Sequence, residues 1–257
     1  MPTLPDSPSQ PTAIITGGSS GIGRAAAIVL ARAGYRCAVI ARRADELVET
    51  VRLCNEAAPT HSLPGGGAGV QPHIPQVCDL ALPGLRASVF TDLVTKLGRV
   101  DVLVNCAGVA RLAPIEKTTN AMLTEAFELN TVATAAAISA VWPTMQRAKG
   151  GVIVNISSMA ALDPFPGFFA YAAAKAAVNM LTVVAVREGS RHNIRAYAIC
   201  PGAVETEMLR SMFNEKVVPR EKAIAPAAVG ELVLACVRGE RPSDGKPIPI
   251  HPQCQLG

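Results

Sequence analysis

The stretch Ala13-Ile-Ile-Thr-Gly-Gly-Ser-Ser-Gly-Ile-Gly-Arg24 joins a short apolar run to an Ala-rich segment through a glycine-rich turn. The residues before the turn favour a strand, and residues 23–33 have helical periodicity. Glycines at a strand-to-helix turn let the backbone approach a pyrophosphate, and the helix N-terminus supplies a favourable field for the anion. The spacing is Gly-x-x-x-Gly-x-Gly rather than the more common Gly-x-Gly-x-x-Gly, and a plain tight turn has the same appearance. The remaining motifs must therefore decide whether the turn binds a dinucleotide.

Short β-branched runs alternate with longer Ala-rich segments along the rest of the chain. This alternation is typical of repeated βαβ units. Right-handed crossovers then give an α/β fold, a doubly wound parallel sheet in a single Rossmann-type domain. The expected strands are residues 13–16, 37–41, 74–78, 100–105, 151–157 and 195–200, with a weak signal at 248–250, and the first expected helices are 23–33 and 44–56.

The length of 257 residues suits one large α/β domain. We predict a flexible tail at residues 1–12, rich in Pro and Ser and without the apolar core of a secretory signal, followed by one oxidoreductase domain at residues 13–257. Residues 59–75 form a long polar stretch around Pro64-Gly-Gly-Gly67. A tolerated surface insertion explains this stretch better than a functional lid.

Composition excludes several classes of partner. The net charge of +4 comes from scattered basic residues, so nucleic acid is not expected as a partner. No uninterrupted apolar run approaches the roughly 18 residues of a membrane span. The seven cysteines are odd in number and several lie in expected strands, which favours a reducing, cytoplasmic location. Neither they nor the four separated histidines have metal-ligand spacing, so no metal is expected.

The segment Tyr171-Ala-Ala-Ala-Lys175 lies in an Ala-rich helical stretch, after the pair Ser157-Ser158 at the end of an expected strand. Residues four apart share a helix face, so the ammonium can lie beside the phenol. Together with the positive ring of an oxidised nicotinamide, it would lower the phenol pKa and make Tyr171 a workable proton donor or acceptor. On an isolated helix this spacing usually marks only an amphipathic edge. The upstream glycine turn and the βαβ order favour the catalytic interpretation.

These motifs together resemble the classical short-chain dehydrogenase/reductase family, over almost the whole range from Ala13 to about Glu240. Thr16, Gly17, Gly21 and Gly23 fill the fixed positions of its Thr-Gly-x-x-x-Gly-x-Gly motif. Asn105-Cys106-Ala107-Gly108 stands where the family usually has Asn-Asn-Ala-Gly, so Cys106 is a departure. Asp79-Leu80 matches the family's adenine contact, and Cys200-Pro201-Gly202-Ala203-Val204-Glu205-Thr206 matches its Pro-Gly loop beside the nicotinamide.

The resemblance also implies a catalytic tetrad and a cofactor site. Ser158 would hold the substrate oxygen, because the family counts thirteen residues back from the tyrosine and so excludes Ser157. Tyr171 would exchange its proton, Lys175 would bind the nicotinamide ribose, and Asn130 would fix a helix distortion and a proton-relaying water. The expected cofactor positions are Gly17, Ser19, Ser20, Gly21, Ile22, Gly23, Arg42, Arg43, Asp79, Leu80, Asn105, Ala107, Gly108, Tyr171, Lys175, Pro201, Gly202, Val204 and Thr206.

The end of the second expected strand favours NADP(H) over NAD(H). Enzymes of this type that use NAD place an acid there to bind the ribose hydroxyls. Here the position is Ala41, followed by Arg42-Arg43. A guanidinium pairs with a 2′-phosphate through two charge-assisted hydrogen bonds. Against this, Ser20 stands where many NADP-using relatives carry a second basic residue.

The leading hypothesis is an NADPH-dependent reductase that converts a ketone, aldehyde or 3-oxoacyl group to an alcohol. Alternatives are an NAD-dependent alcohol or sugar dehydrogenase and a non-catalytic dinucleotide-binding regulator. Substrate selection is expected in residues 110–117, 159–169 and 207–225, where aromatic and Met side chains suggest an apolar wall and a helical lid. The resemblance further implies a homodimer or homotetramer, although the sequence after residue 240 departs from the family.

Overall fold

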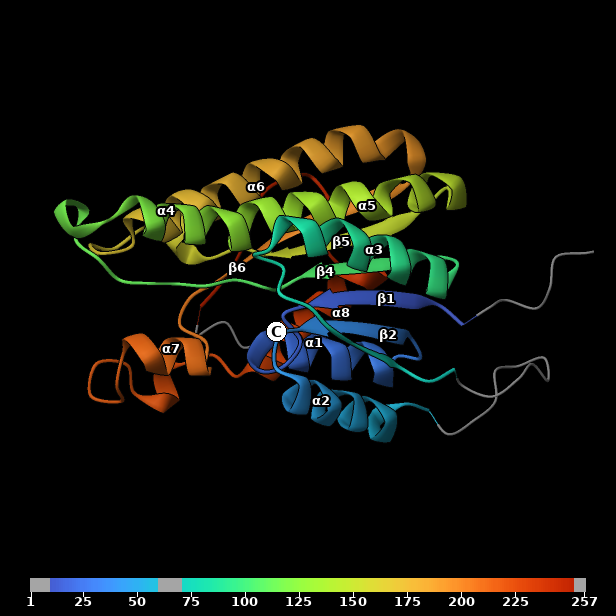
Figure 1. The fold of residues 1–257 in the computed structure, drawn as a ribbon, viewed down its shortest axis with the longest axis horizontal. Helices are drawn as coiled ribbons and strands as arrows, with labels where there is room; N and C mark the ends of the chain where they lie inside the picture. The colour runs from blue at the N-terminus through green and yellow to red at the C-terminus, as the bar shows by residue number, and fades with distance from the viewer. Residues whose placement is uncertain (1–9, 60–70, 252–257) are drawn as a thin grey trace, which may run out of the picture.

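The computed structural model describes residues 10–59 and 71–251 and has a central sheet covered by helices on both faces (Figure 1). The sheet has the strand order β3-β2-β1-β4-β5-β6-β7, and every neighbouring pair is parallel. The strands are β1 Thr12–Thr16, β2 Arg36–Ala41, β3 Ile74–Val77, β4 Val102–Asn105, β5 Gly151–Ile156, β6 Ile194–Pro201 and β7 Ile248–Ile250. The predicted doubly wound parallel sheet is confirmed.

The helices divide into two layers, with α1, α2 and α8 on one face of the sheet and α3, α5 and α6 on the other (Figure 1). The α-helices are α1 Gly21–Arg32, α2 Ala44–Ala57, α3 Pro83–Leu97, α4 Asn120–Phe127, α5 Ala133–Ala148, α6 Phe169–Gly189, α7 Glu207–Met212 and α8 Pro226–Arg238. Short 3-10 turns lie at η1 Ile115–Lys117, η3 Met159–Ala161, η4 Ser190–His192 and η5 Arg220–Lys222, and the π-helix η2 spans Glu128–Val132.

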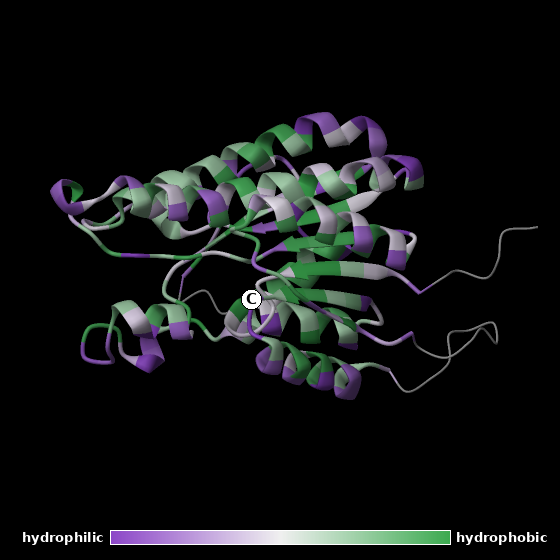
Figure 2. Ribbon diagram, viewed as in Figure 1, coloured by the Kyte–Doolittle hydropathy of each residue, from purple (hydrophilic) through white to green (hydrophobic). Residues whose placement is uncertain are grey.

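Apolar residues dominate the strands because both faces of the sheet are buried, and Figure 2 shows the strands mostly in the hydrophobic colour. Small Ala side chains let α1 lie close to the sheet. The strand order reverses between the neighbouring strands β1 and β4, where the chain crosses from β3 at one edge of the sheet to β4. Ligands of open parallel sheets bind at such a switch point, beyond the carboxyl ends of the strands.

Some predicted boundaries shift by one or two residues. Thr12, placed in the tail by the sequence, is the first residue of β1, where its amide donates to Asp101 Oδ2 at 2.8 Å. The first helix begins at Gly21 rather than residue 23, and Ser157 lies just beyond β5. The weak strand signal at 248–250 is confirmed as β7. The expectations for the first nine residues and for most of the 59–75 loop fall outside the described residues.

One described segment, Phe169–His192, is long and apolar enough to span a membrane by length and composition. Core helices of soluble proteins pass the same criterion, so a single such helix is weak evidence. In this fold the segment is α6 with η4, and it packs along β6. The cysteines in the described ranges are all unpaired, and these ranges hold no cluster of potential metal ligands.

Candidate active site

A cavity of about 560 Å³ opens at the carboxyl ends of the strands, beside the β1–β4 switch point. It gathers all four predicted catalytic residues, Asn130, Ser158, Tyr171 and Lys175. The predicted cofactor positions that line it are Gly17, Ser19, Ser20, Gly21, Ile22, Arg42, Arg43, Asp79, Leu80, Ala107, Gly108, Tyr171, Lys175, Pro201, Gly202, Val204 and Thr206. Gly23 and Asn105 do not line the cavity, and they contact the backbone and side chains next to its lining residues.

The glycine turn leaves no room for side chains on the cavity floor. Gly17 and Gly21 have positive φ values of 69° and 54°. A Cβ at Gly17 would lie 2.7 Å from the backbone of Ala107, and one at Gly21 would lie 2.9 Å from Thr206 Cγ2. Ser20, the residue before α1, makes no side-chain cap. The turn therefore presents bare backbone and a helix N-terminus to the cavity, which fits the pyrophosphate of a dinucleotide.

The two supporting residues act through packing and hydrogen bonds. A Cβ at Gly23 would lie 2.3 Å from the Gly17 carbonyl oxygen, so only glycine lets α1 begin this close to the turn. Asn105 Nδ2 donates to Asn155 Oδ1 at 2.8 Å, and Asn155 Nδ2 donates to Thr182 Oγ1 at 2.8 Å. This buried chain ties β4 and β5 to α6, the helix that carries the tyrosine.

Cys106 replaces the second amide of the family motif without disturbing the local backbone. Its amide and that of Ala107 donate to Thr16 Oγ1 at 3.0 and 3.1 Å, which closes the turn after β4. Burial raises the pKa of the Cys106 thiol to about 12. The thiol is therefore protonated at neutral pH and serves as a small apolar lining group.

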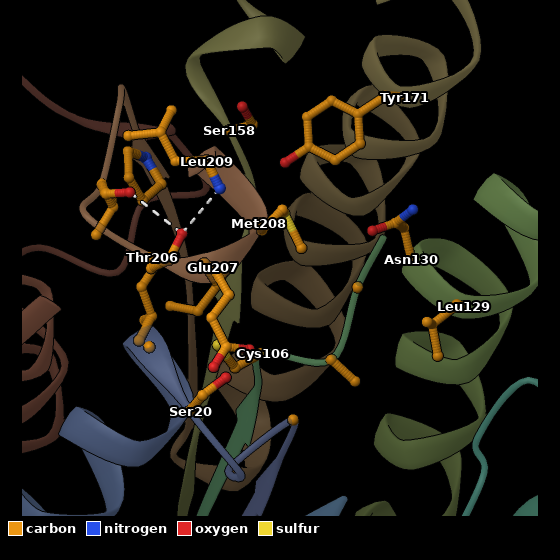
Figure 3. A pocket seen from close by; sticks show the side chains of 18 of the residues that line it. Ser20, Cys106, Leu129, Asn130, Ser158, Tyr171, Thr206, Glu207, Met208 and Leu209 are labelled. Atoms are coloured by element: carbon orange, nitrogen blue, oxygen red, sulfur yellow. Dashed lines mark hydrogen bonds between the residues drawn. The ribbon is translucent and has the colours of Figure 1, made fainter. Parts of the chain in front are cut away.

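Ser158, Tyr171 and Lys175 line the side of the cavity formed by η3 and α6, and Figure 3 shows Ser158 beside the Tyr171 ring. The Ser158 hydroxyl accepts from the Ala160 amide at 3.1 Å, and its hydrogen-bonding influence partly offsets the burial that raises the pKa of the Tyr171 phenol. Lys175 is only 5% exposed, lies 5.8 Å from the centre of the Tyr171 ring, and donates from Nζ to the Ile156 carbonyl oxygen at 2.8 Å. Ser157 instead donates to the Lys175 carbonyl oxygen at 3.1 Å, so the structure favours Ser158 as the substrate-facing serine.

Burial dominates the electrostatics of Tyr171 and Lys175 in this fold, and the expected lowering of the phenol pKa beside an oxidised nicotinamide stays a prediction. Burial raises the pKa of Tyr171 to about 12, and the hydrogen bond from Ser158 opposes this only in part. Burial also lowers the pKa of Lys175 to about 8. Desolvation disfavours the charged form of both groups and outweighs their proximity. The phenol therefore holds its proton at neutral pH, while the ammonium is much easier to deprotonate than usual.

Asn130 lies in the π-helix η2, which confirms the expected helix distortion. Its side chain is fully buried, with Nδ2 donating to the carbonyl oxygens of Ala126 at 2.8 Å and Val109 at 2.9 Å. The neighbouring Glu128 accepts from Arg86 Nη2 at 2.6 Å, and Arg86 is 3% exposed. Sequence analysis missed this pair because its members are 42 residues apart and belong to no motif.

Arg42 and Arg43 both line the cavity at the end of β2, but each faces a carboxylate. Arg42 Nη1 lies 3.9 Å from Asp79 Oδ2. Arg43 Nη1 donates to Glu207 Oε2 at 2.9 Å, and its Nη2 donates to Ser20 Oγ at 2.8 Å. Glu207 was expected only as the first residue of the substrate-selecting segment 207–225 and not among the cofactor positions, although it directly follows the predicted Thr206.

The wall beyond Tyr171 is apolar. Phe168 lies between Phe165 and Tyr171, with ring centres 5.5 Å from each, and Phe213 lies 6.4 Å away. Met208 and Leu209 of α7 also line the cavity (Figure 3). The predicted contributions of 159–169 and 207–225 are therefore present in part, whereas residues 110–117, all within the described ranges, contribute nothing to this cavity.

The Thr206 hydroxyl has a role in α7 itself. It accepts from the Leu209 amide at 3.2 Å and donates to the Val204 carbonyl oxygen at 3.2 Å, as the dashed lines in Figure 3 show. Thr206 is thus the N-cap of α7. It holds the start of this helix against the glycine turn, where its methyl group meets Gly21.

A family model described as short chain dehydrogenase matches residues 11–217. The chain is a short-chain dehydrogenase/reductase. It is 36% identical over 199 residues to a short chain dehydrogenase from Pseudocercospora fijiensis, covering 77% of this chain and 60% of that protein. It is also 32% identical over 201 residues to human 3-oxoacyl-[acyl-carrier-protein] reductase, covering 78% of each.

Other relatives of this short-chain dehydrogenase/reductase differ in their named reactions. A probable galactose dehydrogenase from Rhizobium meliloti is 35% identical over 200 residues, covering 78% of this chain and 74% of that protein. The structure of a 7α-hydroxysteroid dehydrogenase with NADH and 7-oxo glycochenodeoxycholic acid superimposes with a TM-score of 0.82 at 27% identity, covering 95% of this chain and 93% of the other. The chain is accordingly an oxidoreductase that acts on CH–OH or C=O groups with NAD(P), and its family commonly forms oligomers.

Proposed function

We propose that this short-chain dehydrogenase/reductase uses NADPH to reduce the carbonyl group of an apolar ketone or aldehyde to an alcohol. The observation that carries the proposal is the Ser158–Tyr171–Lys175 cluster, which opens on a cavity wall of Phe and Met side chains. A bound nicotinamide cofactor supplies the hydride. Ser158 and Tyr171 hold the carbonyl oxygen, and the Tyr171 phenol gives it a proton.

Protonated Tyr171 fits the role of acid in reduction. A phenol carries its proton at neutral pH even at its usual pKa of about 10, and burial, which raises this pKa to about 12, keeps it protonated. Lys175 keeps its ammonium next to the phenol and stabilises the phenolate that remains after the transfer. Asn130, held by three backbone hydrogen bonds, fixes the cavity wall next to Gly108.

The apolar wall favours a neutral, apolar substrate over a sugar. A sugar needs several hydrogen-bond partners, and Phe165, Phe168 and Phe213 offer none.

Two features at the end of β2 support NADPH. Ala41 replaces the acid that would bind the ribose hydroxyls and repel a 2′-phosphate, and Arg42 and Arg43 follow it on the cavity rim. A 2′-phosphate carries more negative charge than the Asp79 and Glu207 carboxylates that face these two guanidinium groups. It would therefore compete well with them for the two arginines.

The test follows the absorbance of NADPH and NADH with a panel of aromatic and aliphatic ketones, acyl thioesters and aldoses. We expect oxidation of NADPH with the apolar ketones and a loss of at least about a hundredfold in kcat/KM for Tyr171→Phe, as for removal of a general acid. A preference for NADH and aldoses would instead establish a sugar dehydrogenase. Equal rates for Tyr171→Phe would remove the proposed role of the phenol.

We further propose a cytoplasmic homodimer or homotetramer. The unpaired cysteines support a reducing compartment. Val132, Met180 and Val184 are large apolar side chains left exposed on η2 and α6, and burial between subunits would remove them from water. Light scattering of the wild type and of Met180→Glu tests the assembly, with a smaller particle expected for the variant.

A further inference from the structure

We propose that Glu207 is a cofactor-selectivity residue, whose carboxylate competes with the 2′-phosphate of NADP(H) for the guanidinium of Arg43. The inference rests on the proposed use of NADPH. Glu207 lies outside the predicted cofactor positions, and its role here is to disfavour binding of the 2′-phosphate. Glu207 raises the cost of binding a 2′-phosphorylated ribose and leaves binding of the unphosphorylated cofactor unchanged.

The first argument is the position of Arg43 between two walls of the cavity. Its Nη1 donates to Glu207 Oε2 at 2.9 Å, on the first residue of α7. Its Nη2 donates to Ser20 Oγ at 2.8 Å and lies 3.4 Å from Ser19 Oγ, in the glycine turn. Figure 3 shows Ser20 and Glu207 together at the end of the cavity away from Tyr171. The guanidinium therefore connects the phosphate-binding turn to the helix that covers the substrate side.

The second argument is that both terminal nitrogens of Arg43 are already engaged. Paired binding of a phosphate by arginine uses two parallel N–H donors. One terminal nitrogen donates to Glu207 and the other donates to Ser20. A 2′-phosphate that pairs with both terminal nitrogens must share or displace these contacts, so it competes with the Glu207 carboxylate for the Arg43 guanidinium.

The third argument is that the Arg43–Glu207 pair is weak enough to be displaced. The two side chains are 44% and 66% exposed, and exposed ion pairs contribute little in water. The neighbouring pair Arg210–Glu205 is only 19% and 25% exposed. It keeps the segment around α7 in place when Arg43 changes its partner.

Isothermal titration calorimetry with 2′,5′-ADP and 5′-AMP separates the phosphate contribution from the rest of the nucleotide. We expect Glu207→Gln to lower the Kd for 2′,5′-ADP about threefold, as for release of an exposed ion pair. The Kd for 5′-AMP should stay unchanged. Arg43→Gln should raise the Kd for 2′,5′-ADP about tenfold, because a charge-assisted contact to the phosphate is lost. Adding Glu207→Gln to Arg43→Gln should then have no further effect.

Glu231→Gln is the matched control, because Glu231 pairs with exposed Arg32 at 2.5 Å and does not line the cavity. It removes the same charge, so an equal gain in this variant would mean a general electrostatic effect and overturn the inference. No gain for Glu207→Gln, or the same gain without Arg43, would also overturn it. If the wild type binds 2′,5′-ADP no tighter than 5′-AMP, the proposed NADPH preference itself fails.

Discussion

The buried ammonium of Lys175 should make the stability of this protein depend on pH in a way that Lys175→Met removes. Lys175 is 5% exposed, and burial lowers its pKa from 10.5 to about 8. Between these two values the unfolded chain binds a proton that the folded chain has released. The Lys175 contribution to stability therefore rises as the pH increases from about 8 to 10.5.

The linkage relation with these two pKa values gives the size of the effect. The lowered pKa of Lys175 reduces the free energy of unfolding by about 3 kcal/mol at pH 8 and by about 1 kcal/mol at pH 10. Met has a similar length and no charge, so its variant has no such cost. We expect the free energy of unfolding of the wild type, minus that of Lys175→Met, to rise by about 2 kcal/mol across this range.

Urea unfolding followed by far-ultraviolet circular dichroism, at half-unit steps from pH 7 to 10, measures this difference. Other groups that titrate in this range are present in both proteins and largely cancel. Lys96→Met removes an exposed ammonium at the end of α3 and should give a flat difference. A flat difference for Lys175→Met as well, or one that falls with pH, would refute the buried-charge reasoning.

Three other substitutions test the catalytic cluster and its support. Ser158→Ala should lower kcat/KM about a hundredfold in steady-state kinetics, because one donor to the carbonyl oxygen is lost, and an unchanged rate would contradict this role. Arg86→Met should lower the free energy of unfolding by about 2 kcal/mol in urea, because it leaves the partly buried Glu128 carboxylate unpaired, and a change below about 0.5 kcal/mol would contradict it. Gly108→Ala should destabilise by about 2 kcal/mol and reduce activity, because the new Cβ would lie 2.5 Å from Asn130 Oδ1. If Gly108→Ala kept wild-type activity and melting temperature, Asn130 would be able to shift away from the new Cβ, and this prediction would be contradicted.

Local patterns were enough to predict much of the fold. Apolar runs separated by helical segments predict the strands of a parallel sheet, because each strand of this kind must be buried on both faces. The four-residue spacing of Tyr171 and Lys175 predicts that both lie on one helix face, because residues four apart are about one helical turn apart. Boundaries such as the start of β1 at Thr12 depend on a partner, here Asp101, and the sequence pattern does not show that partner.

The motif predicted that Ser158, Tyr171 and Lys175 come together, and it predicted a lowered Tyr171 pKa beside Lys175 and an oxidised nicotinamide. The burial of these side chains has no signal in the motif. In the folded chain burial dominates and raises that pKa. How deeply a side chain is buried depends on helices and loops distant in sequence, so the sign of this shift cannot be derived from spacing alone.

The order of strands and helices, the bare glycine turn and the helix face that carries the phenol and the ammonium follow from local sequence patterns. These features depend on interactions within a few residues of the chain. Which distant charges meet depends on the folded arrangement, as in Arg43 with Glu207, 164 residues apart, and Arg86 with Glu128. That arrangement also excludes residues 110–117 from the cavity wall. Such contacts arise when separate elements dock on the sheet, and a linear pattern has no local signal for that step.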